Sequence, residues 1–320
     1  MGRTVGIVGV GALGLQAAKN LIERGHKVVG YRRSPMDAFV AAGGIAATSA
    51  ADVARQADLV VTLLRPEQAV EEVYFGENGI LSVVRPGLIA VELSTVPMAI
   101  KRKLEAAAKG AGLALLDGTV SGNPNFFKSR TAAVFLGGEQ SVFDQCAETL
   151  RDITDKVTLV GPIGSGRAAK FVALYLVAAH VLAAAEAFEL AERAGLDKAA
   201  MLEAIAGSNA TSAMLESRGR LMVDGGYKDY IPEKVGGTRA DGTKKRGIDS
   251  RLRQIQRLNE LAGALGGRYP LMHAMTAAYE AAADSGHADH DISQVIEYLK
   301  ADAGDPLSEQ RLSELLEHYS

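Results

Sequence analysis

The stretch Gly161-Pro-Ile-Gly-Ser-Gly-Arg-Ala-Ala-Lys170 divides the chain into two parts of different character. Short apolar runs alternate with helical patterns before it, and helical spacing dominates after it. A glycine-rich turn that leads directly into a long apolar helix is typical of a passage between two domains. We therefore predict a first domain over 1–162 and a second over 163–320, joined by a long interdomain helix from Arg167 to Ala194.

Lys170 is the residue of this stretch that most needs a chemical explanation. It lies in the expected first turn of the helix, beside the crevice between the two domains, and the next charged residue is Glu186. A positioned lysine amine can donate or accept a proton in a transition state. We therefore predict that Lys170 is catalytic; the structural alternative is a lysine that only pairs with an acid at the domain junction.

The composition indicates a soluble globular protein. The 320 residues are 48% hydrophobic and 23% charged, with a net charge of −3, which gives no sign of binding to nucleic acid or a membrane surface. The single cysteine, Cys146, excludes an internal disulfide, and we expect no signal peptide before the first strand-like run. The longest uncharged run, Phe171 to Ala185, falls short of the ~20 residues that span a bilayer. We expect a cytoplasmic protein that acts on a small molecule and has no metal site.

A dinucleotide-binding motif opens the first domain. The β-rich run Thr4–Val8 is followed by Gly9-Val-Gly-Ala-Leu-Gly14, and a helical pattern then runs from Leu15 to Arg24 before Gly25. In such a unit the first glycine allows a tight turn, the second admits a pyrophosphate, and the third lets helix and strand pack closely. The alternative is a merely structural glycine-rich turn. The predicted cofactor contacts are Gly9, Val10, Gly11, Ala12, Leu13 and Gly14.

The end of the next strand, Lys27–Tyr31, indicates which dinucleotide binds. An NAD site usually carries an acidic residue there to bind the ribose 2′-hydroxyl. This chain instead has Arg32, Arg33 and Ser34. Guanidinium groups and a hydroxyl suit a 2′-phosphate, so we predict NADP rather than NAD. A solvated basic turn is the alternative.

The alternation of strands and helices continues to residue 160. Further strands are predicted at Asp58–Leu64, Leu88–Leu93, Ala114–Val120, Ala132–Leu136 and Lys156–Val160, with a helix at Ser141–Arg151. This pattern predicts an α/β fold with a doubly wound, Rossmann-type, largely parallel sheet. Ligands bind at the carboxyl ends of such strands. The candidate contacts at these ends are Leu63, Leu64, Arg65, Ser94 and Thr95.

The second domain is predicted to be all helical. After the long helix, Asp197 is expected to cap a helix that runs to Ala206. Further helical patterns cover Ala210–Met222, Asp249–Leu265, Leu271–Ser285, Ile292–Ala301 and Pro306–His318. Asp224–Gly247 is rich in Gly, Lys and Asp and is predicted to be an exposed loop. Because the helices present large apolar faces, we expect a homodimer.

With these motifs in place, the chain resembles the β-hydroxyacid dehydrogenase family over nearly its whole length. Glu92-Leu-Ser-Thr95 is similar to the family's Asp-x-Ser-Thr, and Asp117-Gly-Thr-Val-Ser-Gly122 resembles its substrate loop, Asp-Ala-Pro-Val-Ser-Gly. Gly161-x-x-Gly-x-Gly-x-x-x-Lys170 matches its catalytic signature. Pro270-Leu and Gly286-x-x-x-x-Asp291 also fall in family positions.

The resemblance implies an NAD(P)-dependent oxidation of a β-hydroxy carboxylate, or the reverse reduction, with a C-terminal domain like that of 6-phosphogluconate dehydrogenase. In the family the lysine is the acid/base on the substrate oxygen, and the Ser-Gly of the substrate loop binds the carboxylate. Carried over to this chain, these roles fall to Lys170 as the acid/base and to a substrate-binding set of Ser121, Gly122, Asn123, Lys170 and Leu174.

Three positions depart from the family pattern. Leu174 stands where most relatives have an Asn, and Asn123–Arg130 stands where a glycine-rich loop is usual. In this segment Lys128 and Arg130 are either ligands for a second anionic group or parts of a solvated turn. The family's Lys-Asp appears as Ile248-Asp249, for which Lys244 or Lys245 could supply the charge.

These departures leave three interpretations open. The first is an NADP-dependent β-hydroxyacid dehydrogenase or semialdehyde reductase similar to 3-hydroxyisobutyrate dehydrogenase. The second is an imine reductase-like or bulky-ketone reductase of the same fold, which Leu174 favours. The third is a non-catalytic NADPH-binding module, which gives no reason to keep Lys170.

Overall fold

The computed structural model describes residues 2–226 and 247–301 and divides into two compact units, Met1–Phe171 and Val172–Ser320. The predicted helix Pro306–His318 and Lys244 and Lys245 lie outside the described residues, as does most of the predicted loop Asp224–Gly247. The units divide later than the predicted 162/163 boundary because the first turns of the long helix α8 (Ser165–Arg193) are bonded to the sheet. One such bond joins Thr119 Oγ1 to the Gly166 carbonyl oxygen at 2.9 Å.

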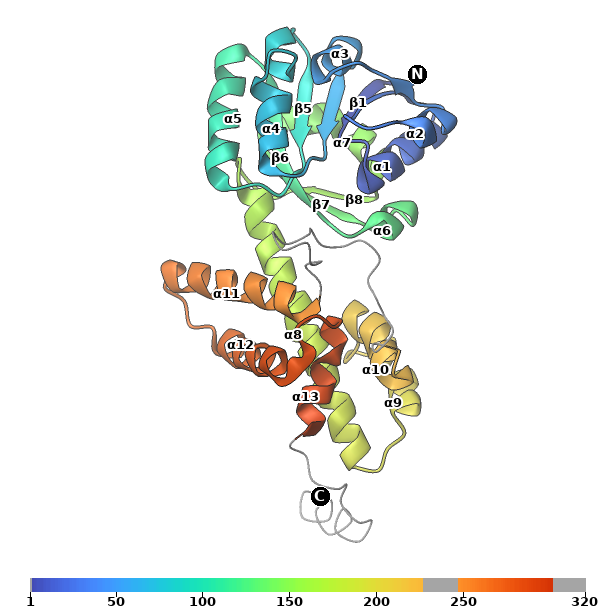
Figure 1. The fold of residues 1–320 in the computed structure, drawn as a ribbon, viewed down its shortest axis with the longest axis vertical. Helices are drawn as coiled ribbons and strands as arrows, with labels where there is room; N and C mark the ends of the chain where they lie inside the picture. Colours follow the sequence, from blue (N-terminus) through green and yellow to red (C-terminus); the bar gives the residue numbers. More distant parts are fainter. Residues whose placement is uncertain (1, 227–246, 302–320) are drawn as a thin grey trace. The chain divides into compact units, whose positions relative to one another are not determined.

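The first unit is a doubly wound α/β fold, as the sequence predicts (Figure 1). Its sheet has eight strands in the order β3-β2-β1-β4-β5-β6-β7-β8. The strands are β1 (Thr4–Val8), β2 (Lys27–Tyr31), β3 (Ile45–Ala46), β4 (Leu59–Thr62), β5 (Ile89–Glu92), β6 (Ala114–Ser121), β7 (Ala133–Gly138) and β8 (Lys156–Leu159). All neighbouring pairs are parallel except β6 and β7, which are antiparallel. The short connection over residues 122–132 explains this pair, because a parallel crossover needs a dozen or more residues.

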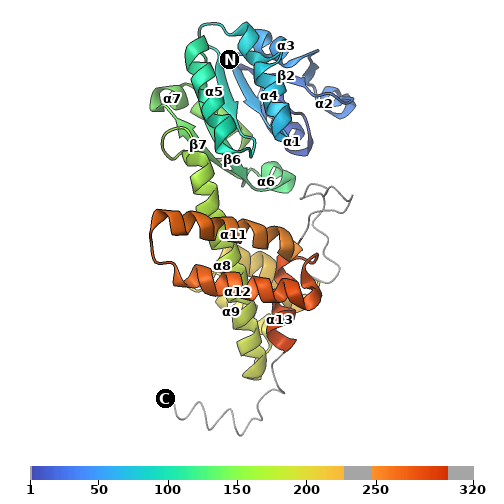
Figure 2. The same cartoon turned by 60° about the vertical axis from the view of Figure 1, so that its left-hand side comes forward.

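Helices cover both faces of the sheet and bury two apolar cores (Figures 1 and 2). The core with α1 and α7 contains Leu21, Phe127 and Leu150, and the core with α3, α4 and α5 contains Val53, Tyr74 and Leu104. The helices of this unit are α1 (Ala12–Glu23), α2 (Asp37–Ala41), α3 (Ala50–Gln56), α4 (Glu67–Phe75), the short 3-10 helix η1 (Ile80–Val83), α5 (Met98–Ala111), α6 (Pro124–Lys128) and α7 (Gln140–Ile153).

The second unit is helical in its described part, with α8 running through its middle (Figure 2). Tyr279, fully buried, donates its hydroxyl to the Ala178 carbonyl of α8 at 3.0 Å. The predicted cap is confirmed, because the Asp197 carboxylate accepts the Ala200 N–H at 2.8 Å. The remaining elements are α9 (Lys198–Ile205), η2 (Leu215–Gly219), α10 (Arg220–Asp224), α11 (Gly247–Leu265), α12 (Pro270–Ala282), η3 (Ala283–His287), η4 (Ile292–Gln294) and α13 (Val295–Ala301).

Among the described helices, α8 alone is long and apolar enough to cross a membrane, with a mean hydropathy of 1.9 over its most apolar window. The core helix of a soluble protein passes the same test of length and composition. Ala178, Val181, Ala185 and Phe188 give α8 a fully buried side within the unit.

Candidate active site

The glycine-rich loop Gly9–Gly14, which runs from the end of β1 into the first turn of α1, gives its three glycines different surroundings. Gly9 has a φ of +97°, and a Cβ there would lie 2.3 Å from the Leu63 carbonyl oxygen. A Cβ on Gly14 would lie 2.3 Å from the Gly9 carbonyl oxygen. A Cβ on Gly11 would meet no protein atom within 4 Å. The protein itself therefore requires Gly9 and Gly14, whereas the open space at Gly11 fits a bound pyrophosphate.

The start of α1 completes this candidate phosphate site. Gly11 is its N-cap and supplies no side chain to the first N–H groups, and the first turn holds no acidic residue. Ala12 is exposed and Leu13 half-buried. N–H groups left without intrahelical partners at a helix N-terminus favour an anion.

A matched pair of substitutions tests this assignment. Gly11→Ala is expected to leave thermal stability unchanged and to weaken NADP(H) binding by ~10-fold or more, because the new methyl group enters the space of the pyrophosphate. Gly14→Ala is expected to lower the melting temperature, since its methyl group meets backbone at 2.3 Å. Thermal unfolding and fluorescence titration with NADPH measure the two effects. Equal cofactor affinity in Gly11→Ala and wild type would rule out a pyrophosphate at this position.

The two arginines that follow β2, Arg32 and Arg33, contact different elements. Arg32 folds onto the glycine-rich loop, donating Nη1 to the Val10 carbonyl oxygen at 2.9 Å and Nε to Ser34 Oγ at 2.6 Å. Arg33 forms an exposed ion pair with Glu72 of α4 at 3.5 Å. Arg32 and Ser34 are therefore the pair that adjoins the loop where a dinucleotide phosphate would lie.

The carboxyl ends of β4 and β5 are joined by one hydroxyl group. Ser94 is buried, and its Oγ accepts the Leu64 N–H at 2.8 Å. This bond connects the loop after β4 to the loop after β5. Leu63 is half-buried, while Arg65 and Thr95 are exposed at this edge of the sheet.

Lys170 and Thr95, predicted separately, are brought together. Lys170 Nζ donates to Thr95 Oγ1 at 3.2 Å. Lys170 lies in the second turn of α8 rather than the predicted first, because the helix begins at Ser165. The Arg167 guanidinium donates to the Val96 carbonyl oxygen, which fixes the first turn of α8 beside the Thr95 loop.

The end of β6 carries the predicted substrate-loop residues. Ser121 is half-buried, Gly122 is exposed, and the Asn123 side chain caps α6 by accepting the Asn125 N–H at 2.9 Å. Leu174 is half-buried on α8.

The segment after Asn123 is a short helix anchored to the core, not a solvated turn. Its Phe127 is fully buried, and Asn20 of α1 donates to the Phe127 carbonyl oxygen at 2.8 Å. The suggestion that Arg130 binds a second anionic group is wrong in this structure, because its guanidinium bonds Asp155 at 2.6 Å and carbonyl oxygens at the end of α7. Lys128 is exposed.

A buried charge cluster lies beneath the Thr95 loop, and the sequence analysis did not predict it. Lys101 of α5 places Nζ 2.9 Å from Glu92 Oε2 and 3.1 Å from Asp117 Oδ2, and it also donates to the Gly118 carbonyl oxygen at 3.0 Å. The three ionisable side chains are at most 2% exposed. A helical spacing signal was present, since Lys101 shares the buried face of α5 with Leu104 and Ala108.

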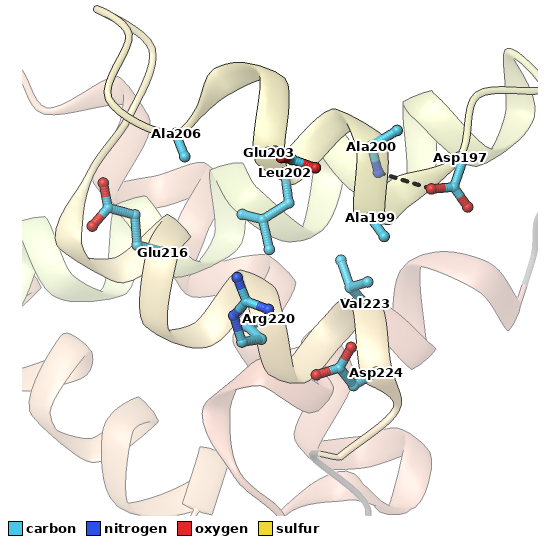
Figure 3. A pocket seen from close by; sticks show the side chains of 10 residues that line it. All are labelled: Asp197, Ala199, Ala200, Leu202, Glu203, Ala206, Glu216, Arg220, Val223 and Asp224. Carbon is cyan, nitrogen blue, oxygen red and sulfur yellow. Dashed lines mark hydrogen bonds between the residues drawn. The ribbon is translucent and has the colours of Figure 1, made fainter.

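A separate pocket of about 680 Å³ lies between α9 and the η2–α10 segment of the helical unit (Figure 3). Figure 3 shows the acidic side chains of Glu203, Glu216 and Asp224 and the guanidinium of Arg220 among small apolar ones. None of the predicted site residues lines it. The candidate active site is therefore assigned to the carboxyl ends of the sheet strands.

Comparisons with known proteins show which family the chain resembles. The sequence model of the NAD binding domain of 6-phosphogluconate dehydrogenase matches residues 4–161, and that of the NAD-binding domain of NADP-dependent 3-hydroxyisobutyrate dehydrogenase matches residues 164–233. Rat mitochondrial 3-hydroxyisobutyrate dehydrogenase is 30% identical to this chain, over 92% of the chain and 87% of the relative. L-threonate dehydrogenase of Cupriavidus necator is 29% identical, over 92% and 96%.

The solved structures show the same likeness over nearly the whole chain. The structure of Mycobacterium tuberculosis 3-hydroxyisobutyrate dehydrogenase with L-serine superimposes with a TM-score of 0.73 at 25% identity, and it covers 94% of this chain and 100% of that one. Together with the glycine-rich loop and the Lys170–Thr95 contact, these similarities show that the chain belongs to the β-hydroxyacid dehydrogenase family.

Proposed function

We propose that this protein is an NADP-dependent dehydrogenase that oxidises a small β-hydroxy acid, or reduces the corresponding semialdehyde, in the manner of 3-hydroxyisobutyrate dehydrogenase. The observation that carries the proposal is the 3.2 Å contact between Lys170 Nζ and Thr95 Oγ1 at the sheet edge. The named relatives, including 3-hydroxyisobutyrate and L-threonate dehydrogenases, support a hydroxyl group as the site of oxidation.

Different residues of the sheet unit have different roles in the proposed reaction. A bound nicotinamide supplies hydride transfer. As the hydride leaves the substrate carbon, the hydroxyl proton must leave the oxygen, and Lys170 accepts it; in reduction Lys170 returns it. Thr95 orients the lysine amine through their hydrogen bond. The Ser121 hydroxyl and the Gly122 N–H are the donors we assign to the substrate carboxylate.

A substrate panel tests the proposal. Wild-type protein with NADP⁺ is expected to reduce the cofactor in the presence of at least one of 3-hydroxyisobutyrate, L-threonate, L-serine, glycerate and 3-hydroxypropionate. Nicotinamide absorbance follows the reaction. Absence of turnover across the panel in protein that still binds NADPH would contradict the proposed substrate class.

The preference for NADP over NAD is a separate part of the proposal, supported by Arg32 and Ser34 beside the glycine-rich loop. Arg32→Ala is expected to weaken NADPH binding by about 10- to 100-fold, because a charge-assisted hydrogen bond contributes about 1.5–3 kcal/mol. NADH binding is expected to be unchanged. Fluorescence titration with both cofactors measures the ratio, and a parallel loss for both would make Arg32 structural.

We also propose a cytoplasmic homodimer, supported by the single cysteine and by an exposed apolar stripe on α8. Val172, Leu176 and Leu190 fall on one line of the helix and are 62%, 45% and 69% exposed. Leu190→Arg is expected to shift the solution mass from two chains to one in light scattering. Val40→Arg, at a 52% exposed apolar residue of α2, is the matched control and should leave the mass unchanged. A monomeric wild type would refute the dimer.

A further inference from the structure

Lys101 has the surroundings of a residue that fixes geometry. Its amine lies at hydrogen-bonding distance from the Glu92 carboxylate, the Asp117 carboxylate and the Gly118 carbonyl oxygen. Two of these contacts are hydrogen bonds, to Glu92 and to the Gly118 carbonyl oxygen, and the third, to Asp117 Oδ2 at 3.1 Å, is an ion pair. The partners belong to the carboxyl end of β5 and to the middle of the neighbouring strand β6, and Lys101 therefore joins the two strands.

Each carboxylate extends from Lys101 toward one member of the Thr95–Lys170 pair. Glu92 Oε1 accepts the Ser94 N–H at 2.6 Å, directly before Thr95. Asp117 Oδ1 accepts the Gly164 N–H at 2.8 Å, in the turn that starts α8 and leads to Lys170. Three hydrogen bonds and the Lys101–Asp117 ion pair thus connect the Ser94 N–H, through Lys101, to the Gly164 N–H.

The charges of the cluster make a purely stabilising role a poor explanation. Two buried carboxylates face one ammonium, and burial raises the pKa of Glu92 against the opposing effects of Lys101 and Ser94. A buried ionic group generally contributes no more stability than well-packed apolar side chains of similar volume. What apolar side chains cannot supply is a set of polar contacts to both strands.

We propose that Lys101 is a positioning residue that sets the relative placement of Thr95 and Lys170 for proton transfer. The proposal rests on the proposed function of Lys170 as the acid/base. Because a displacement of ~1 Å can cost on the order of 10²-fold in rate, loss of this bridge should appear mainly in turnover.

The decisive variant is Glu92→Gln/Lys101→Met. It keeps the net charge of the cluster at −1, as with the two carboxylates and one ammonium of the wild type, while removing the cation that joins the two strands. We expect kcat to fall by ~10- to 100-fold, with KM and the NADPH dissociation constant changed less than about 2-fold and with a cooperative unfolding transition retained. The matched control is Lys103→Met, two residues away on α5, whose exposed amine pairs with Glu71. It should behave as wild type.

Amide hydrogen exchange provides a readout that does not depend on turnover. In the double variant, exchange at Ser94 and Gly164 should be at least ~10-fold faster than in wild type, and Lys103→Met should show no change. Wild-type exchange at both amides would overturn the proposal, as would a double variant with wild-type kcat. If wild type turns over no substrate, the proposed function fails, and the exchange rates alone decide whether Lys101 positions these two segments.

Discussion

Lys170→Ala is expected to lower kcat by about 10²- to 10⁴-fold, the usual cost of removing a general acid/base. The loss should appear equally in kcat/KM if the amine acts mainly in the transition state. NADPH affinity should be nearly unchanged, because the candidate phosphate site is built by the glycine-rich loop and Arg32, on β1, α1 and β2. Steady-state kinetics and cofactor titration measure the two quantities.

Chemical rescue separates loss of the amine from a general disturbance of the site. Small primary amines should restore part of the turnover of Lys170→Ala, since they can occupy the space that the side chain leaves. Lys170→Met is the matched control: it removes the amine but fills the same space, so added amine should not restore activity. Wild-type turnover in either variant would exclude Lys170 as the acid/base.

Local sequence patterns were sufficient to predict the strands and the glycine-rich turn that carry the candidate site. Gly9–Gly14 spans the turn after β1 and the first residues of α1, and Lys27–Tyr31 is a strand with the predicted bounds. Such features are recognisable because strand–turn–helix units depend on neighbouring residues. Lys170 and Thr95 could each be predicted as candidate site residues. Their contact could not, because it depends on how the first turns of α8 pack beside the Thr95 loop.

The residues that the sequence analysis missed are those whose partners are distant in the chain. Lys101 meets carboxylates on β5 and β6, and in sequence it is one of three cations in Lys101-Arg-Lys103. Lys101 is buried because it lies on the face of α5 that packs on the sheet, and tertiary packing determines which face that is. Arg130 was considered an anion ligand or part of a solvated turn because its partner Asp155 follows 25 residues later in the chain, after β7.

The segment after Ser121 illustrates a different difficulty. Asn123-Pro124 suggests a turn, but the same residues also begin a helix, with Asn as N-cap and Pro in the first turn. The burial of Phe127 and its carbonyl bond to Asn20 select the helix. The local sequence is compatible with a turn or a helix, and the contact with α1 selects the helix.

Lys101→Met alone is expected to lower the free energy of unfolding by about 3–5 kcal/mol near neutral pH, because it leaves two buried carboxylates without their cation. Denaturant unfolding of the sheet unit measures the loss. Lys103→Met removes an exposed ion pair and should cost no more than about 1 kcal/mol. Adding Glu92→Gln to Lys101→Met should recover part of the stability, since it removes the second uncompensated charge.

The deficit of Lys101→Met should also depend on pH in a defined direction. Burial raises the pKa of Glu92 in the folded protein, and Lys101 opposes that rise, so removing Lys101 raises the pKa further. Above the carboxyl pKa of the unfolded chain, about 4, the folded variant then binds more protons than the unfolded one. Its stability must therefore fall as pH rises through this window and grow as pH decreases toward ~4, more steeply than in wild type. The loss of unfolding free energy in Lys101→Met relative to wild type should therefore become smaller as pH decreases. If this loss stays constant from about pH 8 to pH 5, the Lys101 side chain acts through packing rather than through its charge.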